Sequence, residues 1–171
     1  MSGMKLLRTI TDQEILGRPG LAEAKSVIKA RAVVRNSDGL YAVICAGTYR
    51  QYTLPGGGVE DGENPQETIR REIREETGCE CLSLEPLGIV EENRAHCGNA
   101  RTTFYYAATV SSNGAAPCFT QAELDENTVL EWVSLEEMIR LIADVSYQTP
   151  HCRFMQARDM AALEAYLQAL R

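Results

Sequence analysis

Residues 57–79 combine a glycine-rich turn with a strongly signalled helix, and this stretch constrains the fold more than any other part of the chain. Asn64 suits the N-cap, because its side-chain oxygen can accept a hydrogen bond from an unpaired backbone N–H of the first turn. Pro65 suits the first helical position, and Gly78 can end the helix in the left-handed conformation. The sequence therefore predicts a helix over residues 65–77, entered from a tight loop.

The predicted helix carries three glutamates on one side. Glu72, Glu75 and Glu76 stand three and four positions apart, the spacing that brings side chains together on a helix. Like charges at this spacing repel each other, and Arg71 can offset only part of the repulsion. A hard divalent cation such as Mg²⁺ or Mn²⁺, which prefers oxygen ligands, would offset more. The residues alone leave two interpretations open: a metal site, or a solvated acidic face on a surface helix.

The spacing of the residues around these glutamates is specific. The stretch runs Gly57, five residues, Glu63, seven residues, and then Arg71-Glu72-Ile73-Arg74-Glu75-Glu76-Thr77-Gly78-Cys79. It resembles the signature of the Nudix hydrolases, G-x5-E-x7-R-E-U-x-E-E-x-G-U, in which U is an apolar residue. All seven fixed positions match, and the last apolar position is Cys79, a departure that bears on packing rather than chemistry.

Residues outside this stretch predict a mixed α and β domain. A hairpin turn at residues 36–39 joins two apolar strands that we expect to pair. Strands are expected over residues 27–34, 40–46, 80–92, 102–110 and 129–133, and helices over residues 135–143, capped by Ser134, and 155–170. This pattern indicates an α/β or α+β fold. The resemblance implies its particular form, a Nudix-type α/β/α sandwich with a mixed β-sheet and a loop–helix–loop catalytic motif.

Length and composition are those of one domain. The chain has 171 residues with 44% hydrophobic residues, enough for a full core. We expect a single Nudix domain over residues 27–171 and an N-terminal extension over residues 1–26. The net charge of −7 disfavours binding to a nucleic-acid polymer, and an anionic substrate would need local arginines or bound metal. No apolar run is long enough to span a membrane and no signal peptide is visible, so we expect a cytoplasmic protein.

The resemblance implies the reaction. Nudix hydrolases cleave a diphosphate (pyrophosphate) linkage in a nucleoside diphosphate linked to another moiety, with Mg²⁺ as the expected cofactor and Mn²⁺ as an option. Such hydrolysis requires charge neutralisation on phosphate oxygens and a nucleophilic water near neutral pH, and bound Mg²⁺ provides both. The alternative is a catalytically silent Nudix-like module that binds or senses a nucleotide. The intact set of Arg71 and three glutamates favours the enzyme.

The resemblance also assigns roles within the stretch. Glu75 and Glu76 correspond to metal carboxylates, and Gly57 to a backbone carbonyl ligand. Glu72 corresponds to a metal ligand or the general base, and these two roles stay open. Arg71 is expected to orient a glutamate through a charge-assisted hydrogen bond. The expected catalytic residues are therefore Glu72, Glu75 and Arg71.

A further carboxylate outside the stretch often completes such a site. Glu126, six residues before Trp132, is the first candidate, and Glu123 is the second. The alternative for both is a solvated acidic loop.

Substrate contacts are expected from the loop before the glycines and from the later hairpin. Arg50 could meet a phosphate, and Tyr49 or Tyr52 could stack on a base, or this loop could simply cover the domain surface. Arg94 and Arg101 could line the substrate pocket, or could be solvated hairpin charges.

The substrate itself is only weakly indicated. The stretch lacks a downstream proline associated with ADP-ribose hydrolases, since Arg94 stands sixteen residues after Gly78, and a tyrosine associated with dinucleoside polyphosphate hydrolases. Nucleoside triphosphates, including damaged ones, are the default, and nucleotide sugars stay possible. We expect a small-molecule nucleotide substrate, and a homodimer is an open option.

Overall fold

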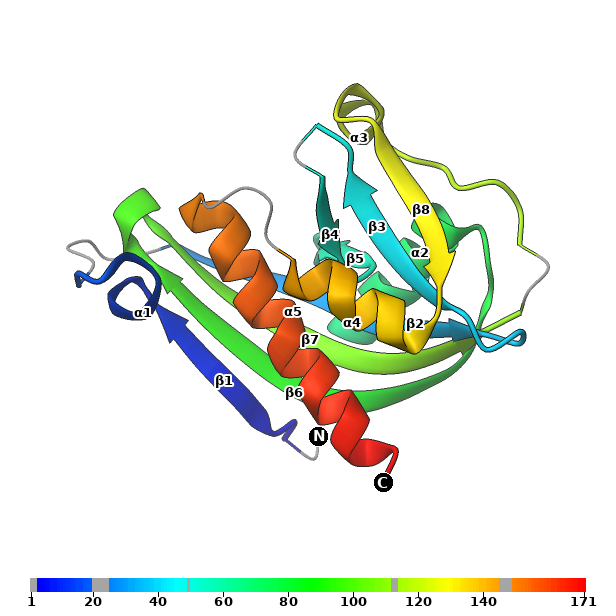
Figure 1. The fold of residues 1–171 in the computed structure, drawn as a ribbon, viewed down its shortest axis with the longest axis horizontal. Coiled ribbons are helices and arrows are strands. Elements are labelled where there is room, and N and C mark those ends of the chain that lie inside the picture. Colours follow the sequence, from blue (N-terminus) through cyan, green and yellow to red (C-terminus); the bar gives the residue numbers. More distant parts are fainter. Residues whose placement is uncertain (1–2, 20–24, 49, 112–113, 145–148) are drawn as a thin grey trace.

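The computed structural model describes residues 3–19, 25–48, 50–111, 114–144 and 149–171. Its main feature is an eight-stranded sheet in which the strand order is β1-β6-β7-β2-β3-β4, with β5 paired to β2 and β8 paired to β3 (Figure 1). The strands are β1 (Leu6–Thr11), β2 (Lys25–Asn36), β3 (Tyr41–Ala46), β4 (Gln51–Thr53), β5 (Gly56–Gly58), β6 (Cys81–Arg94), β7 (Asn99–Val110) and β8 (Thr128–Val133). The helices are α1 (Asp12–Leu16), α2 (Pro65–Thr77), α3 (Gln121–Asp125), α4 (Leu135–Ala143) and α5 (Pro150–Ala169), with a 3₁₀ turn at Ala95–Cys97.

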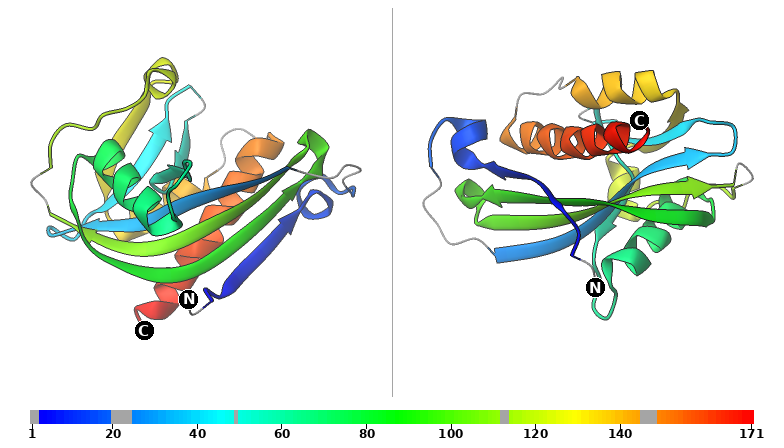
Figure 2. Two further views of the ribbon diagram at one scale, coloured as in Figure 1. Left: turned by 180° about the vertical axis from the view of Figure 1, so that it is seen from behind. Right: turned by 90° about the horizontal axis from the view of Figure 1, so that it is seen from below.

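The sheet is mixed, and helices cover both of its faces. β2 runs parallel to β7, and β1 runs parallel to β6, whereas the remaining pairs are antiparallel. Helix α2 lies on one face, and α4 and α5 lie on the other (Figure 2). This arrangement confirms the expected α/β/α sandwich with a mixed sheet.

Strand β2 shows how one sequence serves two cores. Ala30, Ala32 and Val34 are buried in the cluster that contains Ile69 of α2. Val33, between them in sequence, belongs to the cluster on the α5 face. Successive side chains of a strand point to opposite faces, so a nearly continuous apolar run is required where both faces are covered.

Helix α2 begins and ends where the sequence predicts. The side chain of Asn64 accepts hydrogen bonds from the N–H groups of Gln66 and Glu67, at 2.9 and 3.1 Å. The carboxylate of Glu67 accepts in return from the Asn64 N–H at 2.8 Å, which completes a capping box. Gly78 ends the helix in the left-handed conformation, with φ of 69°. These local contacts fix the helix that carries the three glutamates.

The tight approach of β5 to β2 requires glycine. Gly56 has φ of +137°, and a Cβ there would lie 2.2 Å from the carbonyl oxygen of Ala30. The register places Gly56 opposite Arg31 and Gly58 opposite Lys29. The glycine-rich turn therefore runs against the centre of the sheet, directly beside two cations.

Helix α5 and the N-terminal segment differ from what the sequence predicts. Helix α5 begins at Pro150, five residues before the predicted start at residue 155, because Thr149 caps it and accepts from the Cys152 N–H at 3.2 Å. The expected N-terminal extension contains β1, which pairs with β6 through the register Ile10↔Glu92. The division at residues 26 and 27 stays a prediction.

A buried charged network joins α5 to the sheet. Asp159, fully buried, accepts hydrogen bonds from the Leu54 N–H at 3.1 Å and from the Tyr105 hydroxyl at 2.5 Å. It also accepts from Nε of Arg158 at 2.8 Å, and Arg158 is itself only 1% exposed. One carboxylate therefore serves three donors: the Tyr105 hydroxyl on β7, the Leu54 N–H before β5, and the guanidinium of Arg158. Because these groups are removed from water, losing this acceptor would be costly.

We expect Asp159→Ala to destabilise the fold by about 3–5 kcal/mol, since it leaves the buried guanidinium of Arg158 and the Leu54 N–H without their acceptor. Urea unfolding followed by circular dichroism would measure the loss. Glu164→Ala is the matched control, because Glu164 is an exposed carboxylate on the same helix and should change stability by less than about 0.5 kcal/mol. Equal losses in the two variants would contradict the network.

Candidate active site

Arg71, in the middle of α2, is the centre of a carboxylate cluster. Its Nε and Nη2 donate to the two oxygens of Glu63 at 2.8 and 3.0 Å. Its Nη1 donates to Glu72 at 2.9 Å and to Glu75 at 3.1 Å, and Nη2 also donates to the carbonyl oxygen of Gly58 at 3.2 Å. One guanidinium therefore fixes three carboxylates and the glycine turn with the fork geometry that only arginine offers.

Glu63 holds Arg71 in place rather than facing outward as a free acid. Besides the two bonds from Arg71, its carboxylate accepts from the Thr68 hydroxyl at 2.8 Å and from the Glu60 N–H at 3.3 Å. Hydrogen bonds from Arg71, then from Thr68, lower the pKa of Glu63 to about 2. The residue therefore stays ionised and ties the loop to the helix.

Glu76 is a buried carboxylate. Its side chain is 6% exposed, and Oε2 accepts from the Gly56 N–H at 2.7 Å. Burial raises the pKa of Glu76 to about 8; Glu72 and Glu123 add repulsion, whereas Arg31 and the Gly56 N–H lower the pKa. A carboxylate of this kind is ionised more easily when a cation is bound beside it.

Glu72 lies against the backbone of the glycine turn. A Cβ built at Gly57 would lie 2.1 Å from Oε1 of Glu72, so glycine is the residue that leaves room for this carboxylate. The Glu72 side chain is 12% exposed, and burial raises its pKa although the hydrogen bond from Arg71 lowers it. Glu75 is more open, with 43% of its side chain exposed.

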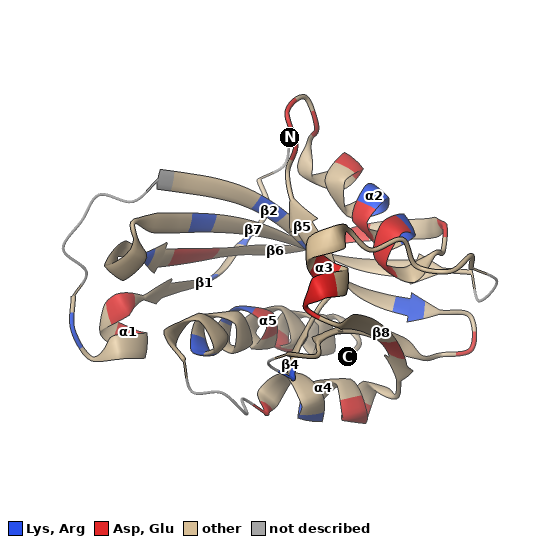
Figure 3. Cartoon of the chain, turned by 90° about the horizontal axis from the view of Figure 1, so that it is seen from above, with Lys and Arg blue, Asp and Glu red and all other residues tan. Residues whose placement is uncertain are grey.

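These residues line one cavity of about 470 Å³ between α2 and α3. Figure 3 marks the acidic positions of α2 and α3 in red. The lining includes Gly57, Arg71, Glu72, Glu75, Glu76 and Glu123, together with the segment Cys118–Thr120. The structure thus brings together every candidate from residues 57–79 that the sequence singled out.

The donor set fits a hard divalent cation. It consists of carboxylate oxygens and a strand carbonyl, one carboxylate is buried with a raised pKa, and a glycine leaves the space beside Glu72. In the part of the chain that the structure describes, no three His, Cys, Asp or Glu side chains form a ready-made ligand set. Glu72 and Glu75 instead direct oxygens at Arg71. Glu72, Glu75, Glu76 and the Gly57 backbone would hold the ion.

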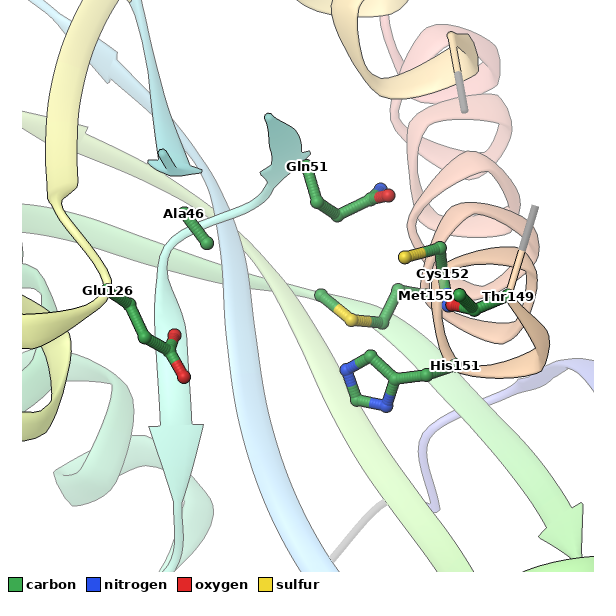
Figure 4. Close-up of a pocket in the computed structure, with 7 residues that line it drawn as sticks. All are labelled: Ala46, Gln51, Glu126, Thr149, His151, Cys152 and Met155. Carbon is green, nitrogen blue, oxygen red and sulfur yellow. The ribbon is translucent and has the colours of Figure 1, made fainter. Parts of the chain in front are cut away.

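The two candidates for an additional carboxylate lie in different places. Glu123, the second candidate, lines the glutamate cavity, where its carboxylate also accepts from the Thr120 N–H at 2.7 Å in a capping box of α3. Glu126, the first candidate, lines a second cavity with Gln51, His151 and Met155 (Figure 4). Glu123 lies within the short helix α3, whereas Glu126 is the C-cap of that helix. Glu123 is the better placed of the two.

The expected substrate contacts do not reach the glutamate cavity. Arg50 is exposed, with φ of +48°, and Tyr49 lies outside the described residues. The hydroxyl of Tyr52 donates to Glu131 at 3.0 Å, and burial together with this bond raises the pKa of Tyr52 to about 12. In this structure, Tyr52 packs against the core on the α5 face.

Arg94 is a buried structural cation in this structure. It is 2% exposed, donates to Glu92 at 2.9 Å, and lies 4.8 Å above the ring of Phe154. Its Nη1 lies 3.2 Å from Nδ1 of His151, a residue that lines the second cavity. Arg94 is therefore not a solvated hairpin charge, and its expected place in the substrate pocket stays a prediction.

Sequence reasoning missed the segment that closes the glutamate cavity. The N–H of Cys118 donates to the carbonyl oxygen of Glu75 at 2.7 Å, and the N–H of Ala115 donates to that of Gly78 at 2.8 Å. Nothing in the sequence signals these long-range contacts. The pattern Thr120–Glu123, a threonine followed by glutamate three residues later, is a capping-box signal that could have revealed α3.

A sequence model of the NUDIX domain matches residues 25–152. The chain belongs to the Nudix hydrolase family. The resemblance inferred from the Nudix box, residues 57–79, is thereby confirmed. Members of this family generally use divalent metal ions, in agreement with the oxygen donors gathered here.

Curated relatives match this Nudix protein over a short stretch. The nucleoside triphosphatase NudI of Escherichia coli O139:H28 is 57% identical over 35 residues, which cover 20% of this chain and 25% of the relative. NudI of Shigella flexneri matches to the same extent. The match therefore spans only a quarter of the length of these relatives.

Solved Nudix structures share the fold over most of the chain. A NUDIX hydrolase from Nitrosomonas europaea superposes with a TM-score of 0.61 and 23% identity, covering 86% of this chain and 92% of the other. The NUDIX domain of Shewanella oneidensis NrtR, complexed with ADP ribose, gives 0.63 and 16%, covering 95% and 100%. At these identities the likeness concerns the fold. No described helix is long and apolar enough to cross a membrane.

The buried Glu76 generates a pH-dependent prediction for the metal-free Nudix protein. Its pKa is about 8 in the folded state against a usual 4.5, so between these values the folded protein keeps a proton that the unfolded chain has lost. Stability should therefore fall as pH rises from 5 to 8 in EDTA. We expect Glu76→Gln to fall less steeply in urea unfolding over this range.

Glu80→Gln is the matched control, since Glu80 is exposed, pairs with Arg74 outside the cavity, and should leave the wild-type slope unchanged. Parallel pH profiles for the wild type and Glu76→Gln would show that Glu76 is not a buried, protonated acid.

Proposed function

We propose that the protein is a Mg²⁺-dependent hydrolase that cleaves a diphosphate linkage of a nucleotide. The observation that carries this proposal is the cavity in which Glu72, Glu75 and Glu76 meet the Gly57 backbone, with Arg71 fixing two of the three carboxylates. A solvated acidic face would not bury Glu76. The family membership supports the same class of reaction.

Each residue of the site has its own role in this proposal. A divalent ion, when bound, supplies charge neutralisation on phosphate oxygens and lowers the pKa of a water. Arg71 orients Glu72 and Glu75, and the Gly56 N–H orients Glu76. Glu72, whose pKa burial raises, is suited to accept a proton from the attacking water or to bind the ion. Glu63 keeps Arg71 in position.

A nucleoside triphosphate is the proposed substrate class. The similarity to a protein described as a nucleoside triphosphatase supports it, although the shared stretch is 35 residues. Because the NUDIX domain of Shewanella oneidensis NrtR was solved in complex with ADP ribose, ADP ribose is the alternative substrate to be tested. Mg²⁺ as the particular ion, a cytoplasmic location and a homodimer stay predictions from the sequence.

We expect Glu75→Gln and Glu76→Gln each to lower kcat by about 10²-fold or more, because they remove ligand charge while keeping side-chain volume. The measurement is product release with Mg²⁺ over canonical and oxidised nucleoside triphosphates, ADP-ribose, nucleotide sugars and dinucleoside polyphosphates, resolved by chromatography. EDTA should abolish turnover. Glu80→Gln, on the loop after the same helix, should keep wild-type rates.

Two outcomes would contradict this function. Wild-type turnover in both variants would exclude the glutamate cavity as the active site. A folded protein that binds a nucleotide tightly with Mg²⁺ and releases no product from the whole panel would favour the silent binding module instead.

A further inference from the structure

The α5 face of the sheet carries charged residues that the glutamate cavity does not use. Lys29 and Arg31 alternate along β2, and Arg101 and Thr103 alternate along the neighbouring β7. The parallel register places Lys29 opposite Thr103. Alternating positions share a face, and Tyr105, next in the series, donates to Asp159 of α5. These four side chains therefore share the face that α5 covers.

Two of the cations on this face already have carboxylate partners. Arg158 pairs with Asp159 at 2.8 Å, and Arg94 pairs with Glu92. Lys29, Arg31 and Arg101 have no ion pair with any residue that the structure describes. The charged groups that act most on Lys29 and Arg101 are mainly cationic. On the α5 face, five cations thus stand with two carboxylates, in a chain of net charge −7.

Buried polar atoms without partners lie in the same place. Thr103 is fully buried, and its hydroxyl has no hydrogen-bond partner among the described residues. The same holds for Nε of Arg31 and for one carboxylate oxygen of Glu92. Burying such groups unsatisfied costs stability. Hydroxyl and guanidinium donors beside an unpaired ammonium are the groups that recognise a phosphate.

This cation group begins beside the glutamate cavity. The β2–β5 register sets Lys29 opposite Gly58 and Arg31 opposite Gly56. Arg31 is close enough to the carboxylates of Glu72 and Glu76 to lower the pKa of both. Lys29 and Arg101 are half-buried, so they remain reachable from solvent.

We propose that Lys29, Arg31 and Arg101, with the hydroxyl of Thr103, form a binding site for a phosphate group of the substrate. This phosphate lies outside the diphosphate linkage that is cleaved. The proposal rests on the proposed function and deepens it: the preferred substrate carries an anionic group beyond the two phosphates held at the glutamate cavity. A nucleoside triphosphate has such a group. A nucleoside diphosphate sugar, which ends in an uncharged ring, lacks it.

The cations are costly in the absence of an anion. Burial first, and then repulsion from Arg31, Arg101 and Arg158, lowers the pKa of Lys29 to about 8. If a residue serves the structure alone, replacing it should lower the stability of the protein. A residue kept for binding an anion should leave the free protein at least as stable when it is replaced by a neutral side chain.

The first test needs neither metal nor turnover. Inorganic phosphate is titrated in EDTA at constant ionic strength, with binding followed by ³¹P NMR and the midpoint of thermal unfolding measured in parallel. We expect the wild type to bind phosphate, and Lys29→Met and Arg101→Gln each to weaken binding about tenfold, the loss of one charge-assisted contact. Lys29→Met should unfold at the same temperature as the free wild type or higher.

Arg35→Gln is the matched control, because Arg35 is an exposed cation on the same face of β2, four residues beyond Arg31. It should keep wild-type phosphate affinity, as should Glu75→Gln, which alters the glutamate cavity. A wild type that does not bind phosphate, or equal weakening in Arg35→Gln, would overturn the site.

The second test uses turnover. In Lys29→Met and Arg101→Gln, KM should rise about tenfold for a nucleoside triphosphate and less than about twofold for the matching nucleoside diphosphate sugar. Equal changes for both substrates would overturn the assignment of the extra anionic group. A different outcome would separate the two proposals. If the variants weaken phosphate binding as expected but the wild type turns over no substrate, the phosphate site is supported and the hydrolase function is contradicted.

Discussion

The repulsion among three glutamates within one and a half turns of α2 is the constraint on which the site depends. Without compensation, Glu72, Glu75 and Glu76 would destabilise the helix that carries them. Arg71 meets two of them and is itself held by Glu63, whereas the Gly56 N–H meets the third. Compensation therefore comes from the loop before the helix as much as from the helix, which explains why the glycine turn and α2 act as one unit.

That unit is stable only because the rest of the fold holds the glycine turn against the sheet. β5 pairs with β2, and the buried carboxylate of Asp159 binds the N–H of Leu54 just before β5. Asp159 in turn is neutralised by Arg158 and bonded by Tyr105 of β7. Helix α5 thus holds the residue before β5, and α2 holds the glycine turn itself, so helices on opposite faces fix the same cavity.

The sequence predicts the parts of this protein that local contacts decide. The limits of α2 follow from Asn64, Pro65 and Gly78, whose effects act within a few residues. The place of Arg94 depends instead on Glu92, His151 and Phe154, which meet only after the sheet and α5 pack together. Distance along the chain, rather than residue type, separates what could be predicted from what could not.

The two acidic candidates before β8 illustrate the same limit. Glu123 and Glu126 are three residues apart and equally acidic, and the sequence favoured Glu126 by its distance from Trp132. In the structure, Glu123 lines the glutamate cavity with residues of α2, whereas Glu126 lines the second cavity with residues of α5. Lys29 and Arg31 carried a signal that local reasoning overlooked: two cations at alternate positions of a strand share one face of the sheet.

In the proposed phosphate site, these two cations would give an acidic protein a place for an anionic substrate. Charges of opposite sign lie on either side of the glycine turn, with Glu72 and Glu76 toward α2 and Lys29 and Arg31 toward α5. Each group alone is unfavourable, since like charges crowd in partly desolvated surroundings. A metal ion beside the glutamates and a phosphate beside the cations would relieve both at once.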